Sequence, residues 1–394
     1  MRDDPDDLDR LVDELNASTA ERPRATPQLE AWLFTLRDAD GSDLYLVAGL
    51  PPCIRVDGAV RRLSGPSLDG DDIEAQVLPA LPPHAATAYR TQGHADASLR
   101  VGPGGRFRIN LHRERGRAAA SIRALPVRPP RLEELGLPPG IEALTRLPHG
   151  LLLIGGPTGS GKTTTVAALV DLINRRDARH IVTIEDPIEF EHRHERSVVE
   201  QVEIGVDAPD FPTALRSAVR QSPDVIVIGE MRDPETMRIA LAAGETGHLV
   251  LSTLHTSDVT STVSRVSDAF PSERQPTIRQ ELSMALGAVM TQILVPKIGG
   301  GRIPAAELLV VGYGARQHIR KNALQHLHQE ITITRRSGSF TFEESLAQLV
   351  RGGVLDIEEA RARAIHRDEL EGLLTGLGGM PPGAGGGLGS RITS

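Results

Sequence analysis

The first third of the chain combines helical and alternating hydrophobic patterns in short segments. Apolar residues that recur every three or four positions predict a helix, and apolar residues that alternate with polar ones predict half-buried strands. The predicted elements are a helix over residues 29–36 and strands over residues 43–48, 54–56, 106–111 and 118–123. These short elements indicate a small mixed α+β domain that ends near Leu125.

The pattern changes after a proline-rich connector, LPVRPPR, at residues 125–131. We expect an extended linker there, because proline excludes helix and restricts the residue before it. Beyond the linker, fully apolar strands alternate with helical segments. These strands are predicted over residues 151–154, 181–184, 225–228 and 249–252. Such runs are typical of a parallel sheet that helices cover on both faces.

The two ends of the chain differ in composition from the middle. Residues 1–21 hold eight acidic side chains against two arginines, which accounts for most of the net charge of −8. The simplest interpretation is a solvated leader, although one short amphipathic helix is an alternative. Glycine-rich residues at the other end predict a disordered tail. The predicted organisation is a leader at 1–26, a first domain at 27–125, a linker at 126–138, a second domain at 139–335, C-terminal helices at 336–375 and the tail at 376–394.

Composition limits the classes of protein that fit. No apolar run approaches the roughly 18 residues that a membrane helix needs, so any membrane contact is expected to be peripheral. The N-terminus shows no apolar segment behind a basic start, so we expect no secretory signal and a cytoplasmic protein. Cys53 is the only cysteine, which excludes an internal disulfide and a zinc site built on paired CxxC units.

A glycine-rich motif follows the first apolar strand of the second domain. The sequence GPTGSGKT at residues 156–163 is a complete GxxxxGK[ST] between a strand and a helix. Glycines let backbone N–H groups surround phosphates, Lys162 reaches the β- and γ-oxygens, and the Thr163 hydroxyl can bind Mg²⁺. The predicted phosphate-binding residues are Gly156, Pro157, Thr158, Gly159, Ser160, Gly161, Lys162, Thr163 and Thr164. The motif predicts that the chain binds ATP or GTP.

Hydrolysis also needs carboxylates near the ends of neighbouring strands, where ligands bind in sheets of this type. One acidic cluster, with Glu185 and Glu189, follows the strand at 181–184. A second, with Glu230 and Asp233, follows the strand at 225–228. Either cluster alone could instead cap a helix, but both together behind a phosphate loop favour catalysis.

Two histidines, His248 and His255, flank the next predicted strand. A histidine at a strand end is more often a hydrogen-bonded structural residue than a catalytic one. The spacing alone therefore supports no role for either.

Taken together, these motifs resemble those of the secretion and pilus ATPases, the GspE/PilT family, over most of the chain. GPTGSGKTTT at 156–165 is similar to the family's Walker A, TIEDPIEF at 183–190 to its Asp box, IGEMRDPET at 228–236 to its Walker B, and ETGHLVLSTLHT at 245–256 to its His box. The resemblance implies a PAS-like first domain and a RecA-like P-loop ATPase domain. It also implies that Glu189 activates water, that Glu230 holds Mg²⁺ through water, and that His248 and His255 sense the γ-phosphate.

The first domain and the C-terminal region resemble the PilT-like retraction ATPases of type IV pili. Six arginines lie within residues 106–123, and the resemblance implies that Arg108 and Arg123 reach the triphosphate of an adjacent subunit. The alternative interpretation is that these arginines only form a basic face exposed to solvent. GARQHIRKNALQHL at 314–327 is similar to a segment that retraction motors need, but Gly314 stands where proline is common, and Gln317 and His318 replace asparagine and leucine.

The implied function is a hexameric motor that hydrolyses ATP with Mg²⁺ and retracts pili, which drives twitching motility. Its implied partners are copies of itself, a PilC-like inner-membrane platform protein and a second retraction ATPase, at the inner face of the cytoplasmic membrane. An accessory PilU-type ATPase and an assembly or secretion ATPase remain alternatives. A nucleic-acid translocase is more distant, because aromatic residues are only 3% and the net charge is negative.

Overall fold

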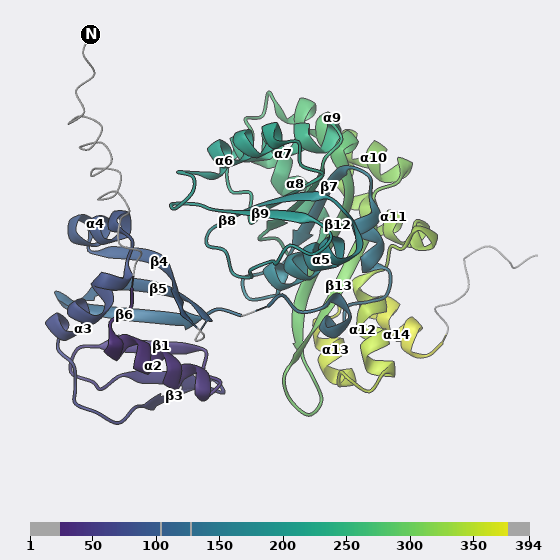
Figure 1. The fold of residues 1–394 in the computed structure, drawn as a ribbon. Helices are drawn as coiled ribbons and strands as arrows, with labels where there is room; N and C mark the ends of the chain where they lie inside the picture. Colours follow the sequence, from purple (N-terminus) through teal and green to yellow (C-terminus); the bar gives the residue numbers. More distant parts are fainter. Residues whose placement is uncertain (1–23, 103–104, 127, 377–394) are drawn as a thin grey trace, which may run out of the picture. The chain divides into compact units, whose positions relative to one another are not determined.

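The computed structural model describes residues 24–102, 105–126 and 128–376, which form two compact units (Figure 1). The first unit runs to Arg128 and includes Glu189–Glu191, and the second contains the rest. Nearly all of the predicted leader and tail lies outside the described residues.

The first unit is built on an antiparallel six-stranded sheet in the order β3-β2-β1-β6-β5-β4. Its strands are β1 (Asp43–Val47), β2 (Cys53–Val56), β3 (Ala59–Arg62), β4 (His94–Val101), β5 (Gly105–Glu114) and β6 (Arg117–Ala124). Its helices are α2 (Pro27–Asp38), α3 (Gly70–Val77) and α4 (Pro83–Gln92). The apolar residues Leu29, Leu33 and Leu36 recur on one side of α2 and are fully buried in the core that the helices share with the sheet.

The second unit contains a seven-stranded sheet in the order β13-β12-β7-β11-β10-β8-β9. Its strands are β7 (Gly150–Gly155), β8 (His180–Glu185), β9 (Val198–Glu203), β10 (Val225–Ile228), β11 (Leu249–Leu254), β12 (Leu286–Pro296) and β13 (Arg302–Val310). All neighbours pair in parallel except β12 and β13, which are antiparallel. The sequence patterns did not predict β12, because Thr291 and Gln292 interrupt its apolar run although both are buried.

Helices cover both faces of this sheet, as the fully apolar strands require. One face packs against α5 (Lys162–Arg176) and the short 3₁₀ helices η3 (Leu132–Leu135) and η4 (Ile141–Arg146). The opposite face packs against α6 (Phe211–Ala218), α7 (Pro234–Glu245), α8 (Val259–Asp268), α9 (Gln275–Ala285), α10 (Tyr313–Arg320) and α11 (Leu327–Ile333). The central strands β7, β10 and β11 are buried over their whole length.

Three C-terminal helices, drawn in yellow in Figure 1, pack beside β12 and β13 through a separate apolar cluster. They are α12 (Phe342–Arg351), α13 (Ile357–Arg363) and α14 (Arg367–Leu374). These three helices lie within the predicted C-terminal helical segment at 336–375, and α13 ends at Arg363 because the backbone of Ala364 is extended. The predicted fold class, a mixed α+β domain followed by an α/β domain with C-terminal helices, is confirmed. Among the described residues, no helix is long and apolar enough to span a bilayer.

Candidate active site

The phosphate loop connects the carboxyl end of β7 to the first residue of α5. Gly156 and Gly161 have φ angles of +151° and +88°, a region that residues with a Cβ rarely adopt. A Cβ on Gly156 would also collide with Ser160 Oγ and the carbonyl oxygen of Gln292. The loop therefore needs glycine at these positions, both for its conformation and for the close approach of its backbone.

Lys162 is buried against the loop at the start of α5, with 7% of its surface exposed. Its Nζ donates hydrogen bonds to the carbonyl oxygens of Gly156 (2.8 Å) and Pro157 (3.0 Å). Burial lowers the pKa of Lys162, and the negative charge of Glu230 partly opposes that shift. The ammonium group thus already lies where phosphate oxygens could replace the two carbonyls as charge-assisted partners.

Glu230 lies two residues beyond the end of β10 and is largely buried. Its Oε1 is 2.6 Å from a terminal guanidinium nitrogen of Arg232, and its Oε2 is 3.5 Å from His255 Nε2. The neighbouring Asp233 has the structural role instead, because its Oδ1 accepts a hydrogen bond from Thr236 N (2.8 Å) and caps α7. Asp233 therefore caps a helix, whereas Glu230 contacts Arg232 and His255.

His255 follows β11 and lies between the loop and Glu230. Its Nδ1 is 3.4 Å from Thr158 Oγ1, while Nε2 faces Glu230. Because β7, β10 and β11 run parallel, their carboxyl ends meet at one edge of the sheet. This shared edge brings together Thr158, Lys162, Glu230 and His255, which we call the phosphate cluster.

His248 precedes β11 and lies at the opposite end of that strand. Its carbonyl oxygen accepts a hydrogen bond from Gly150 N (3.0 Å) at the start of β7, and its Nδ1 is 3.1 Å from Ala243 O. The strand between the two histidines spans about 20 Å at 3.3 Å per residue. Within one chain His248 therefore lies at the far end of β11 from the phosphate cluster, and its role as a γ-phosphate sensor stays a prediction.

The Asp-box carboxylates lie at the end of β8 and in the segment that follows it. Glu185 Oε1 accepts hydrogen bonds from Thr183 Oγ1 (2.7 Å) and Gln201 Nε2 (3.1 Å) at the ends of β8 and β9. Glu189 belongs to the short segment that groups with the first unit. The role of Glu189 as the water-activating residue stays a prediction.

Arg108 and Arg123 are register partners on β5 and β6 of the first unit. Together with Asp43, Asp96 and other polar residues they line a cavity of about 440 Å³. Arg123 Nε is 2.9 Å from Asp43 Oδ1, and a terminal nitrogen of Arg108 is 3.5 Å from Asp96 Oδ1. Both guanidiniums remain partly exposed, so each could still bind a further anion.

The second unit fits a magnesium nucleotide. Ser160 Oγ is buried without a hydrogen-bond partner among the described residues. The Thr163 side chain is exposed at the start of α5, and the Glu230 carboxylate lies at the same edge. No group of three His, Cys, Asp or Glu side chains in the described ranges is arranged to hold a metal by itself. Mg²⁺ bound to phosphates needs only one or two protein groups, which Thr163 and Glu230 would provide.

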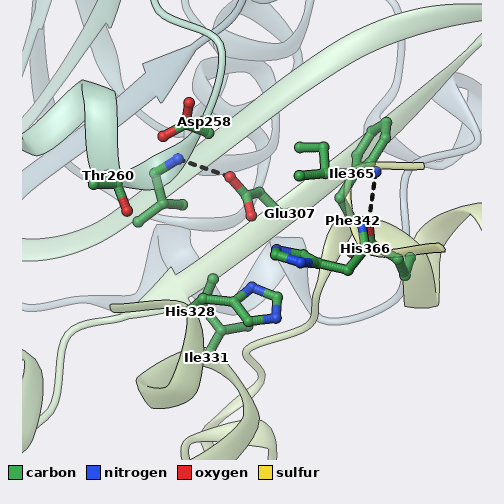
Figure 2. Close-up of a pocket in the computed structure, with 10 residues that line it drawn as sticks. Asp258, Thr260, Glu307, His328, Ile331, Phe342, Ile365 and His366 are labelled. Carbon is green, nitrogen blue, oxygen red and sulfur yellow. Dashed lines mark hydrogen bonds between the residues drawn. The ribbon is translucent and has the colours of Figure 1, made fainter. Parts of the chain in front are cut away.

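A second cavity of about 140 Å³ lies in the second unit between α8, β13 and the C-terminal helices (Figure 2). Glu307 Oε1 accepts hydrogen bonds from Val259 N (2.7 Å) and Thr291 Oγ1 (2.9 Å) at one side of it. Burial raises the pKa of Glu307. None of the residues predicted for catalysis lines this cavity, so it is distinct from the phosphate cluster.

Comparisons with known proteins agree with this geometry. Residues 118–362 match the family described as "Type II/IV secretion system protein". The chain is 42% identical to the type IV pilus retraction ATPase PilT of Pseudomonas aeruginosa over 82% of this chain and 94% of that one. It is 34% identical to the type IV pilus ATPase PilU of the same organism, over 87% and 90%. A crystal structure of the pilus retraction motor PilT with bound ADP is 39% identical, with a TM-score of 0.78 over 86% of this chain and 98% of that one.

Proposed function

Because the chain belongs to the type II/IV secretion system protein family and is an ATPase of that family, we propose that it hydrolyses ATP to retract type IV pili and thereby drives twitching motility. The observation that carries this proposal is the 42% identity to a pilus retraction ATPase over 82% of the chain. The phosphate cluster supports it chemically, because it places a lysine, a carboxylate and a histidine around one loop.

The site residues take complementary roles in this reaction. Backbone N–H groups of the loop and Lys162 bind the β- and γ-phosphates, and the lysine gives up its carbonyl partners to do so. Thr163 would hold Mg²⁺ directly and Glu230 would hold it through water, and the bound ion would supply positive charge that offsets the charge on the phosphates. Glu189 orients and deprotonates the attacking water, and His255 detects the γ-phosphate beside Glu230.

The motor works as a ring of six copies. Arg108 and Arg123 of one copy contact the triphosphate held by its neighbour and stabilise the charge that develops during phosphoryl transfer. Their register pairing on one sheet supports this, because it presents two guanidiniums together. Nucleotide binding and hydrolysis change the relative positions of the two units through the linker at 126–138, and the resulting rotation performs the work.

The rotation is transmitted to a PilC-like platform protein, with the ring bound peripherally at the inner face of the cytoplasmic membrane. A second retraction ATPase is a further partner. An accessory role of the PilU type is the second candidate function, supported by 34% identity to PilU over 87% of the chain. Assembly or secretion by the same chemistry is a third. Retraction by this protein in cells that lack any other retraction ATPase would separate the first role from the others.

The test of the ring is ATP turnover measured across a size-exclusion column, for the wild type, Lys162→Ala and Glu189→Ala. We expect turnover only in fractions near six subunits and none in either variant, with nucleotide binding lost in Lys162→Ala and kept in Glu189→Ala. Equal turnover by the monomer would contradict the arginine mechanism and leave a P-loop ATPase without a ring.

A further inference from the structure

Gln292 on β12 contacts the phosphate loop and α5 at the same time. Its side chain is 2% exposed. Its Nε2 donates a hydrogen bond to the carbonyl oxygen of Ser160 (2.8 Å), and its Oε1 accepts one from Thr165 Oγ1 (2.9 Å). One buried amide therefore joins the last turn of the loop to the first turn of the helix.

The loop packs closely on this strand position. The carbonyl oxygen of Gln292 occupies the space that a Cβ on Gly156 would need, and its Nε2 lies 3.3 Å from the Cβ position of Gly161. Two of the three glycines in the loop, Gly156 and Gly161, therefore leave room for Gln292 to pack against the backbone. A loop packed this tightly cannot shift without breaking a buried hydrogen bond, which costs far more than losing an exposed one.

The neighbouring residue on β12 points to the other face of the sheet. Thr291 Oγ1 donates to Glu307, at the cavity that Figure 2 shows, whereas Gln292 faces α5. Consecutive side chains on a strand alternate between faces, so position 292 is the one aimed at the loop.

We propose that Gln292 is a positioning residue for nucleotide binding: it fixes the loop backbone and the first turn of α5 in the geometry that receives the phosphates. Preorganised N–H groups bind an anion better than groups that must first be ordered. The inference rests on nucleotide binding by the second unit and does not depend on pilus retraction or on the ring.

The experiment compares ADP affinity, by titration with a fluorescent ADP, in the wild type, Gln292→Met, Thr165→Val and the double variant. Methionine keeps the length of the side chain and removes both hydrogen bonds, whereas Thr165→Val removes one. We expect Gln292→Met to raise the Kd for ADP about tenfold or more, and Thr165→Val to raise it less. The double variant should bind no more weakly than Gln292→Met, because the two changes remove a shared interaction.

Asn174→Leu is the matched control. Asn174 is also a buried amide on α5 that joins two backbone groups, the carbonyl oxygen of Arg193 and the N–H of Glu195. It lies twelve residues beyond Lys162, about 18 Å along the helix. We expect this variant to lower Tm without nucleotide and to keep the wild-type Kd.

A Kd for Gln292→Met within twofold of the wild type would overturn the proposal, as would an equal loss of affinity in Asn174→Leu, which would indicate general destabilisation. If Gln292→Met does not fold, Thr165→Val decides, because it removes the hydrogen bond by which Gln292 holds the first turn of α5. A wild-type Kd in Thr165→Val would then count against the proposal. Failure of ATP-driven retraction, by contrast, would contradict the proposed function and leave these affinities unaffected.

Discussion

His255 and Glu230 face each other at the phosphate edge of the sheet, with Nε2 of the histidine 3.5 Å from Oε2 of the glutamate. The other ring nitrogen is 3.4 Å from the hydroxyl of Thr158 in the loop. One imidazole therefore links the nucleotide loop to the carboxylate that follows β10. In the proposed mechanism, a change at the γ-phosphate would reach Glu230 through this ring.

We expect His255→Ala to lower kcat about tenfold to a hundredfold with little change in nucleotide affinity, because the loop and Lys162 stay intact. Steady-state turnover and a separate binding titration would measure the two effects. His149→Ala, at an exposed position of the same unit, serves as the control. A large loss of affinity with kcat kept would show that His255 acts in binding instead.

The arginine pair gives a second prediction. Arg108→Ala and Arg123→Ala should each lower turnover by about a hundredfold or more with ATP binding kept, because guanidiniums that act in trans stabilise the transition state. Arg61→Ala, on the exposed strand β3, should change neither quantity.

Mixing two variant subunits tests directly whether the arginines of one subunit act at the nucleotide site of its neighbour. Arg123→Ala subunits keep an intact phosphate loop, and Lys162→Ala subunits keep intact arginines, so mixed rings should regain part of the turnover that either variant lacks. No recovery on mixing, in rings shown to exchange subunits, would argue against catalysis across the interface.

Gly314 supplies a third prediction. A Cβ at this residue of α10 would collide with the carboxylate of Glu330 on α11, which is buried and lies 3.5 Å from His318 Nε2. We expect Gly314→Ala to lower the free energy of unfolding by about 1–3 kcal/mol through overpacking. Denaturant unfolding would measure it.

Two further variants serve as controls for Gly314→Ala. Gly314→Ala in a Glu330→Ala background should cost less than in the wild type, because the clash is gone. Gly372→Ala, in α14 with nothing near its Cβ position, should be neutral or slightly stabilising. Equal losses for both glycines would mean that the carboxylate is not the cause.

The fourth prediction concerns pH. The hydrogen bond that His328 donates to Glu369 raises the pKa of His328, and the charges of Glu343 and Glu307 act in the same direction against the effect of burial. His328 and His366 lie together in the cavity of Figure 2. A raised pKa in the folded state means that the ionised histidine stabilises the fold below its unfolded pKa of about 6.5, and that this contribution is lost as the pH rises through the folded pKa.

We therefore expect the difference in Tm between the wild type and His328→Gln to be larger at pH 6 than at pH 8.5. His84→Gln, at an exposed position on α4, should show no such pH dependence. A difference that stays constant across this range would show that His328 contributes through packing rather than through its charge.

The sequence by itself determined the phosphate loop, the acidic cluster that follows β10, and the division into a mixed α+β domain and an α/β domain with a mostly parallel sheet. Each of these depends on a few consecutive residues: glycines that adopt their own φ angles, a lysine that bonds to carbonyls five and six residues away, and strands buried on both faces. The local sequence is sufficient to specify geometry of this kind.

Only the tertiary structure decided which neighbours in sequence share a site. It separated His255 from His248 by the length of β11, and it made Asp233 a helix cap while Glu230 faces the loop. It also brought Gln292 to Ser160 across 132 positions of the chain. These outcomes follow from the order β12-β7-β11-β10, which long-range packing selects and which no local hydrophobic pattern contains.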